Sequence, residues 1–248
     1  MKNPGVHDRS RRRRLSAAVS LRAPAIGLML AMAAGLALGL KPPPPPALAL
    51  ITKVIPEVSR KSAAADWTKA GKGELLVSGD QVRTGTRSLA IIKFLDNSIV
   101  RVRELSELTV TGEAGPGKFT KSLRLVGGAL GFEIKKQVDE QFRLTSPTSV
   151  ASIRGTKGKW SGGQGNDTLV VIEGLVNLKN SSSGNETDVA GGFIGFSSQD
   201  GSVSSRRATE QELADAANAA GTGSANELNL ELRDSHGKKK ELKLKYRR

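Results

Sequence analysis

From residue 50 to about residue 205, the chain alternates short apolar runs with clusters of turn residues. An apolar run from Leu89 to Leu95 breaks at Asp96-Asn97-Ser98 and β-branched residues resume at Ile99, which is the pattern of a β-hairpin. Similar runs recur throughout the region and predict about ten to twelve strands. Helical periodicity is scarce before residue 208, so the pattern favours an all-β fold, an antiparallel β-sandwich or jelly-roll-like domain, over a parallel doubly wound sheet.

The apolar pattern also suggests how the strands divide in the middle of this region. Leu105, Leu108 and Val110 continue the pattern that follows the first hairpin. Gly127-Gly128 then separates an apolar run at 122–126 from another at 129–134. Because paired glycines interrupt strands, we expect two separate strands here.

The C-terminal part of the chain has a different pattern. Thr209 and Glu212 have the spacing of a capping box, and the Ala-rich stretch 210–220 predicts a short helix. Beyond a linker, leucines alternate with polar residues on both sides of a turn at 234–237, which predicts a terminal β-hairpin. An isolated hairpin is marginally stable, so we expect it to dock on the domain, to pair with another chain or to stay disordered.

The N-terminal residues have the three parts of a secretory signal. Arginines at positions 9, 11–14 and 22 form a basic region, 23–40 is an uncharged apolar run, and Ala47-Leu48-Ala49 offers small residues for cleavage. At 18 residues the run is at the short end for a membrane span, so an uncleaved anchor is the second interpretation. We expect an exported, periplasmic or otherwise extracytoplasmic protein whose residues 23–40 are either removed or anchor it to the membrane.

The net charge of +14 belongs to the two ends of the chain. Residues 1–49 hold 8 basic residues and 1 acidic residue, and residues 236–248 hold 7 and 1, which leaves 23 basic and 22 acidic residues in between. The central region is close to neutral, so we do not expect it to bind nucleic acid. The basic C-terminal end could rest on an anionic envelope polymer or lipid, or be a solvated end.

The composition excludes several kinds of chemistry. The chain has no cysteine, so disulfides, zinc thiolate sites and cysteine nucleophiles are absent. The two histidines, His7 and His236, lie in the charged ends. No spacing singles out a pair of carboxylates for glycoside hydrolysis. Residues 162–169 match one copy of a calcium-binding nonapeptide, but such sites need stacked copies, so we interpret the segment as a hairpin turn. We therefore expect no enzymatic activity, no cofactor and no metal.

Two groups of polar residues stand out from the strand pattern. In the segment 146–158, Arg154 is flanked by apolar residues, and we expect it to be an interior residue at a seam between strands. Glu173 could lie near Arg154 as a charged partner, either in a structural pair or in a ligand-binding pair. Asp80 and Arg83 follow a turn, whose N–H groups a carboxylate such as that of Asp80 readily caps.

Four segments carry a resemblance to a known family. The segment 78–85 (SGDQVRTG) is similar to the GD-x-[IV]-[RK]-T segment of the FecR-type periplasmic domain, and 90–98 (AIIKFLDNS) resembles its L-x-F-x-D-G-S hairpin, with Asn97 in place of glycine. The segment 146–156 resembles T-P-x-x-x-x-x-V-R-G-T, and 171–176 (VIEGLV) resembles V-x-E-G-x-V. We expect the matching residues to be structural: Gly79, Asp80, Arg83, Thr84, Asp96, Pro147, Arg154, Gly155, Thr156, Glu173 and Gly174.

The FecR resemblance implies an all-β extracytoplasmic domain without catalytic activity, which in the best-known members transmits a signal from an outer-membrane receptor to a sigma factor. About 22 residues precede the apolar run, so we expect a stand-alone module without the cytoplasmic anti-sigma domain of those regulators. We expect this module to bind or sense a ligand, protein or polymer of the cell envelope. The alternative is a structural or assembly protein of the envelope that acts through strand edges and the C-terminal hairpin.

The patterns together divide the chain into four parts. We expect a signal peptide or membrane anchor at 1–49 and a FecR-like all-β domain at 50–205. A short helix and linker follow at 206–225, and a basic β-hairpin tail occupies 226–248.

Overall fold

The computed structural model describes residues 45–62, 65–115, 118–136, 140–163, 165–221, 227–233 and 239–245. The apolar run at 23–40, which we expect to be a signal or an anchor, lies outside these residues. Within the described ranges, no helix is both long and apolar enough to cross a membrane.

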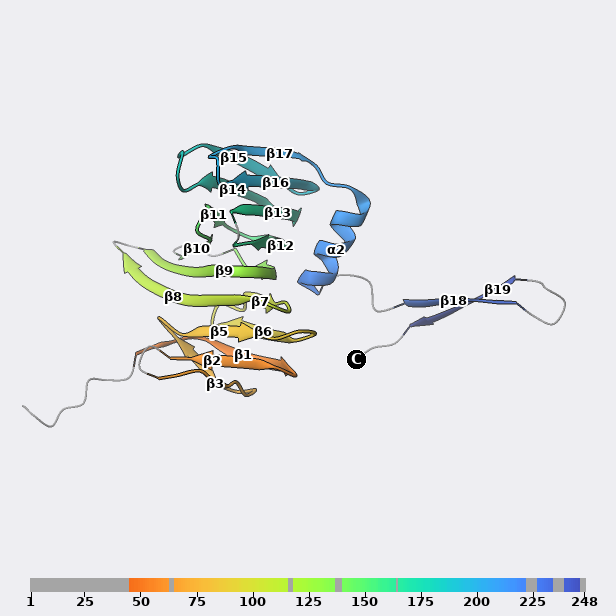
Figure 1. The fold of residues 1–248 in the computed structure, drawn as a ribbon, viewed down its shortest axis with the longest axis horizontal. Helices are drawn as coiled ribbons and strands as arrows, with labels where there is room; N and C mark the ends of the chain where they lie inside the picture. Colours follow the sequence, from red (N-terminus) through yellow and green to blue (C-terminus); the bar gives the residue numbers. More distant parts are fainter. Residues whose placement is uncertain are drawn as a thin grey trace, which may run out of the picture. The chain divides into compact units, whose positions relative to one another are not determined.

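The described residues form an all-β domain, one α-helix and a separate β-hairpin, as the sequence predicts (Figure 1). The domain has seventeen strands rather than the ten to twelve expected, because several short polar segments also pair. The strands are β1 (Ala47–Ile55), β2 (Val58–Lys61), β3 (Thr68–Lys69), β4 (Leu75–Val77), β5 (Gln81–Thr84), β6 (Leu89–Phe94), β7 (Ile99–Val102), β8 (Glu107–Gly115), β9 (Lys118–Ile134), β10 (Glu140–Thr145), β11 (Ser149–Ile153), β12 (Thr156–Gly162), β13 (Asn166–Glu173), β14 (Leu175–Asn180), β15 (Glu186–Ala190), β16 (Phe193–Ser198) and β17 (Val203–Arg207).

Hydrogen-bonded pairing arranges these strands into two sheets. Sheet A has the order β4-β1-β6-β7-β9-β12-β13-β16-β17. Sheet B has the order β3-β2-β5-β8-β9-β10-β11-β14-β15. All pairs are antiparallel except β9 with β10. Strand β9 belongs to both sheets, because its first part pairs with β8 and β10 and its last part with β7 and β12.

The core lies between the two sheets. Strands in both sheets alternate buried and partly exposed residues, and the buried side chains of the two sheets form one cluster. Phe94 of sheet A and Phe142 of sheet B meet edge to face with ring centroids 5.1 Å apart. This alternation is the two-residue period that the sequence shows, with one face of each strand turned into the sandwich.

Helix α2 (Glu210–Ala220) has the bounds that the sequence predicts. Thr209 and Glu212 form the expected capping box, and the helix ends at Gly221 in the left-handed conformation. The helix packs on the outer face of sheet A, where it buries Val170 and Ile194 against Ala216. Its last turn has no basic residue, but Arg101 of β7 lies beside Gly221, where a cation is favourable for the helix dipole.

The predicted C-terminal hairpin is also present. Strands β18 (Glu227–Arg233) and β19 (Lys239–Lys245) pair with each other in an antiparallel register. Leu228 pairs with Leu244 and Leu230 with Leu242, so four leucines occupy paired positions.

Two expectations about individual strands are wrong. Gly127-Gly128 does not end a strand, because β9 runs continuously from 118 to 134 and passes from one sheet to the other at these glycines. Leu105 does not continue the buried pattern of Leu108 and Val110. Those two residues are fully buried, whereas Leu105 is 66% exposed in the connection between β7 and β8.

Candidate functional site

Asp80 is a buried structural carboxylate. One of its oxygens, Oδ2, accepts hydrogen bonds from the Val77 amide and from the Arg60 guanidinium, each at 2.9 Å. The preceding Gly79 has a φ of 94°, which a side chain would strain. Asp80 therefore caps its turn as the sequence predicts, and Arg60 balances its charge.

Thr84 and Ser106 form a buried hydroxyl pair that fixes the connection between β7 and β8. The Ser106 amide donates to Thr84 Oγ1 at 3.0 Å, and Thr84 Oγ1 donates to the Arg103 carbonyl. Ser106 Oγ in turn exchanges hydrogen bonds with the backbone of Ala129 in β9, at 3.0 and 2.9 Å. These contacts hold Arg103 and Ser106, and with them the segment that contains Leu105, in place.

Leu105 itself adopts a φ of 53°, in the left-handed region that leucine disfavours. Its amide donates to the Gly85 carbonyl at 3.1 Å, and its side chain is turned to solvent. An exposed leucine gains nothing from burial in this position. The surrounding hydrogen bonds therefore impose a strained backbone that presents an apolar side chain at the surface.

Val126 lies at a β-bulge in β9. Glu107 pairs with Gly127 and Leu108 with Leu125, which leaves Val126 as the extra residue of β9. The valine is 45% exposed. Gly163 approaches it closely, because a Cβ on Gly163 would lie 2.2 Å from the Val126 carbonyl oxygen.

Leu105 and Val126 line a groove of about 410 Å³. Its other lining residues are Arg83, Thr84, Ser106, Glu107, Gly127, Gly128 and Gly163. Arg83 stacks on the Trp67 ring, with its guanidinium carbon 4.4 Å from the ring centroid. The groove thus combines two exposed apolar side chains with one positive and one negative side chain, which suits the binding of an amphipathic segment.

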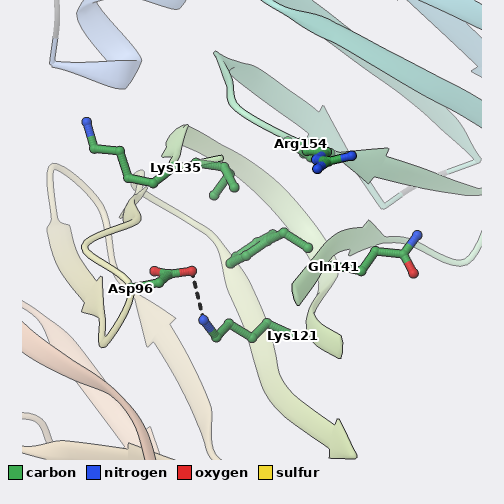
Figure 2. Close-up of a pocket in the computed structure, with 8 residues that line it drawn as sticks. Asp96, Lys121, Lys135, Gln141 and Arg154 are labelled. Carbon is green, nitrogen blue, oxygen red and sulfur yellow. Dashed lines mark hydrogen bonds and ion pairs between the residues drawn. The ribbon is translucent and has the colours of Figure 1, made fainter. Parts of the chain in front are cut away.

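A second recess contains two of the residues that the sequence singles out, Asp96 and Arg154 (Figure 2). The Asp96 carboxylate pairs with Lys121 Nζ at 2.7 Å, and both side chains are less than 8% exposed. Asp96 also accepts from the Ser98 amide at 2.8 Å, while Asn97 takes the left-handed turn conformation expected of it. The recess measures about 10 Å³, enough for one water molecule but not for an organic ligand.

The expectation that Arg154 is an interior seam residue is wrong. Its side chain is exposed on the rim of this recess, and within the described ranges no hydrogen bond or ion pair of its guanidinium is found. Glu173 does not pair with it, because the Glu173 carboxylate lies 3.2 Å from Lys157 Nζ at the surface. Arg154 directly follows the buried Ile153 at the end of β11, so the alternation of the strand places it on the outward side.

Thr156 occupies the seam instead. It is 1% exposed, and its hydroxyl donates toward the carbonyls of Arg154 and Leu175 at 3.4 and 3.3 Å. Gly174 packs against this point, since a Cβ there would lie 2.7 Å from the Gly155 carbonyl oxygen. Gly155, Thr156 and Gly174, which match the FecR motifs, thus lie where two segments of the chain approach each other closely.

Pro147 is exposed, but the residues around it anchor the turn between β10 and β11. Ser146 Oγ accepts from the amides of Thr148 and Ser149 at 3.0 and 2.9 Å. The hydroxyls of Ser146 and Ser149 both donate to Oδ2 of Asp167, which is 2% exposed in β13. Asp167 belongs to the segment with the calcium-like pattern, and this segment forms the expected turn between β12 and β13.

The structure does not gather the predicted residues into one site. Thr84 and Arg83 line the groove, Asp96 and Arg154 line the recess, and the remaining matches lie at separate turns and seams. Sequence reasoning missed Leu105 and Val126. The sequence feature that pointed to this place was the pair Gly127-Gly128 after Val126, because glycines within a strand can mark a β-bulge as well as the end of the strand.

Comparison with known proteins agrees with the four motif segments. Residues 80–177 match the family model described as FecR protein, which confirms the FecR resemblance over this range. Two crystal structures, both of a candidate anti-sigma factor from Parabacteroides distasonis, have a TM-score of 0.46 and 10% identity, and the alignment covers 53% of this chain. This chain spans 61% of the length of that protein. No curated protein matches the sequence.

Proposed function

We propose that this chain, which carries a FecR-type domain over residues 80–177, is an exported module without enzymatic activity that binds a protein partner in the cell envelope. The groove at Leu105 and Val126 carries this proposal. Exposed apolar side chains that line one groove are typical of interaction sites, whereas apolar residues scattered singly over a surface are ordinary. The FecR resemblance implies that partner binding serves signal transduction.

The strain at Leu105 supports binding rather than simple surface packing. A glycine or asparagine would fit a φ of 53° with less strain, so leucine at this position costs the folded state free energy. Contact of the exposed Leu105 side chain with a partner would offset this cost. Val126 is likewise an exposed apolar residue, on the same side of β9 as Arg124 and opposite the buried Leu125.

The buried carboxylates of the described residues have structural partners. Asp80 and Asp96 accept hydrogen bonds from backbone amides of their own turns, and Asp167, in β13, accepts a hydrogen bond from the Ser149 hydroxyl. No group of three His, Cys, Asp or Glu side chains that could hold a metal occurs in the described ranges. His7 and His236 lie outside those ranges.

A site-specific cross-link tests the proposal, because the chain has no cysteine of its own. The Leu105→Cys variant is labelled with a thiol-reactive photocrosslinker, incubated with envelope extract of the source cell and illuminated. We expect one discrete adduct whose yield falls when Val126→Asp is added. The matched control is Thr109→Cys, which places the same probe on the outer face of sheet B. An adduct that forms equally from Thr109→Cys, or no adduct from Leu105→Cys, contradicts the proposal.

The alternative role in envelope assembly through strand edges stays a prediction. Edge strand β17 carries Arg206 and Arg207, both exposed and stacked on Phe196 and Phe193. Charged side chains on an edge strand oppose pairing with another chain, so this edge does not favour assembly.

A further inference from the structure

The outer faces of the two sheets differ in polarity. On sheet B, one cross-strand row runs through Gln81, Thr109, Arg124 and Thr145, as expected of a face in contact with water. On sheet A, the outward positions of β4, β1, β6 and β7 are mostly apolar. We call these the β1–β7 patch: Leu75, Leu50, Ile55, Leu89, Ile91 and Ile99.

The register shows that these residues face away from the core. Their neighbours along the strands, including Ala90, Ile92 and Val100, are fully buried, and alternate residues of a strand point to opposite faces. The patch residues are partly exposed, and Leu75 is 54% exposed. A solvated antiparallel sheet normally carries polar residues at such positions, so an apolar outer face indicates a covering element.

Helix α2 covers the other half of the same face. It packs over β12 and β13 and extends to β9 and β7, and its end at Gly221 lies against Arg101. Arg101 is the cross-strand partner of Ile91, which is in the middle of the β1–β7 patch. The cover that α2 supplies thus ends at the border of the patch.

The next element of the chain has the composition to continue this cover. In the hairpin register, Leu228 with Leu244 and Leu230 with Leu242 occupy one face by the two-residue period, and the glutamates at 227, 231 and 241 occupy the other. A two-stranded hairpin needs to bury such a face to be stable. Strand β18 begins six residues after Gly221. Six residues of extended chain reach about 20 Å. Neighbouring strands of a sheet are about 4.8 Å apart, so this reach is longer than the width of the few strands between Arg101 and the edge of the patch.

The charges on the patch are compatible with a hairpin of this kind. Lys53, Lys93 and Arg101 alternate with the apolar residues across the strands. Long basic side chains can extend along an apolar layer and keep their charged ends at its rim.

We propose that the hairpin β18–β19 packs its leucine face on the β1–β7 patch and extends the cover that α2 begins on sheet A. The C-terminal hairpin is then an integral outer layer of the domain. This inference is independent of the proposed groove, which lies at the connections between the sheets and not on this face.

Thiol accessibility in the full chain tests the proposal. The Ile91→Cys variant is compared with the same variant carrying Leu228→Ser, Leu230→Ser, Leu242→Ser and Leu244→Ser. We expect a maleimide reagent to label the Ile91→Cys thiol at least about tenfold more slowly when the leucines are present, because docking must open before labelling. The control is Thr109→Cys on sheet B, which we expect to be labelled at the same rate in both backgrounds.

Protection must also be intramolecular. We expect the protection of the Ile91→Cys thiol to be independent of protein concentration. We also expect an oxidised Ile91→Cys/Leu230→Cys double variant to migrate as a cross-linked monomer. Equal labelling with and without the leucines overturns the proposal. Protection that grows with concentration, together with a cross-linked dimer, assigns the patch to a second copy, and protection that requires anionic vesicles assigns it to a lipid surface. Either result also overturns the proposal.

Discussion

Gly131 of β9 and Ala219 of α2 meet backbone to backbone. A β-carbon built on Gly131 would lie 2.0 Å from the Ala219 carbonyl oxygen, far inside any permitted contact. The helix can therefore lie on sheet A only because this strand position has no side chain. The neighbouring contacts of Ala216 with Val170 and Ile194 depend on the same close approach.

Gly131→Ala should consequently weaken the docking of α2. We expect a loss of about 1–3 kcal/mol in unfolding free energy, the usual cost of overpacking, measured by chemical denaturation. Gly127→Ala is the matched control, because nothing lies within 4 Å of the added carbon in the same strand. If both variants unfold like the parent chain, the helix does not need the close approach.

Thr156 should matter more for stability than Arg154. We expect Arg154→Ala to change the unfolding free energy by less than about 0.5 kcal/mol, because the side chain is exposed. Thr156→Val should cost about 1 kcal/mol, because it removes the hydroxyl that serves two carbonyls at the seam. The reverse order in thermal melts would restore the structural role first predicted for Arg154.

Leu105→Gly should stabilise the protein. Glycine adopts a φ of 53° without the strain that leucine carries, so we expect a gain of about 0.5–1 kcal/mol in unfolding free energy. Leu95→Gly is the control, because Leu95 is 71% exposed and has no positive φ, and that change should destabilise slightly. Loss of stability in Leu105→Gly would show that the leucine contributes to packing.

Asp167→Ala should disrupt the link between the β10–β11 turn and β13. The buried hydroxyls of Ser146 and Ser149 lose their acceptor, which we expect to cost about 2–4 kcal/mol in denaturant unfolding. The exposed Asp188, which accepts from the Asn177 amide at 3.0 Å, serves as the control, with a change below about 0.5 kcal/mol for Asp188→Ala. Equal effects would mean that the buried network adds no stability.

Glu212 should titrate abnormally. Hydrogen bonds from the Arg206 guanidinium, and then from the Thr209 amide, lower the pKa of the Glu212 carboxyl to about 2. Because the folded pKa is below the ordinary value, the stability that Glu212 contributes is present above about pH 4.5 and is lost as the pH falls toward 2. An NMR titration should locate this pKa, and Arg206→Gln should move it back toward its usual range. An ordinary pKa in the parent chain would mean that the pair does not form in solution.

Local patterns determined much of this structure. The two-residue alternation identified the β-sandwich, and the capping box at Thr209 and Glu212 located α2. The carboxylate of Asp80 caps its turn, and Asn97 replaces glycine in its hairpin, as short-range rules predict. Each of these features depends on residues within a few positions of one another, so the sequence by itself was sufficient.

Only the tertiary structure decided which side chains serve long-range contacts. Arg154 and Thr156 are two residues apart, yet Arg154 is exposed and Thr156 is buried at a seam. Gly174, between β13 and β14, packs against Thr156 from the other side of this seam. Leu105 looked like part of a buried run, but the hydrogen bond from the Ser106 amide to the Thr84 hydroxyl fixes a connection whose leucine side chain lines the groove together with Val126. The sequence determined the elements of this protein because strand, cap and turn preferences are local. The groove, the seam and the apolar outer face required the pairing of distant strands, which no local pattern encodes.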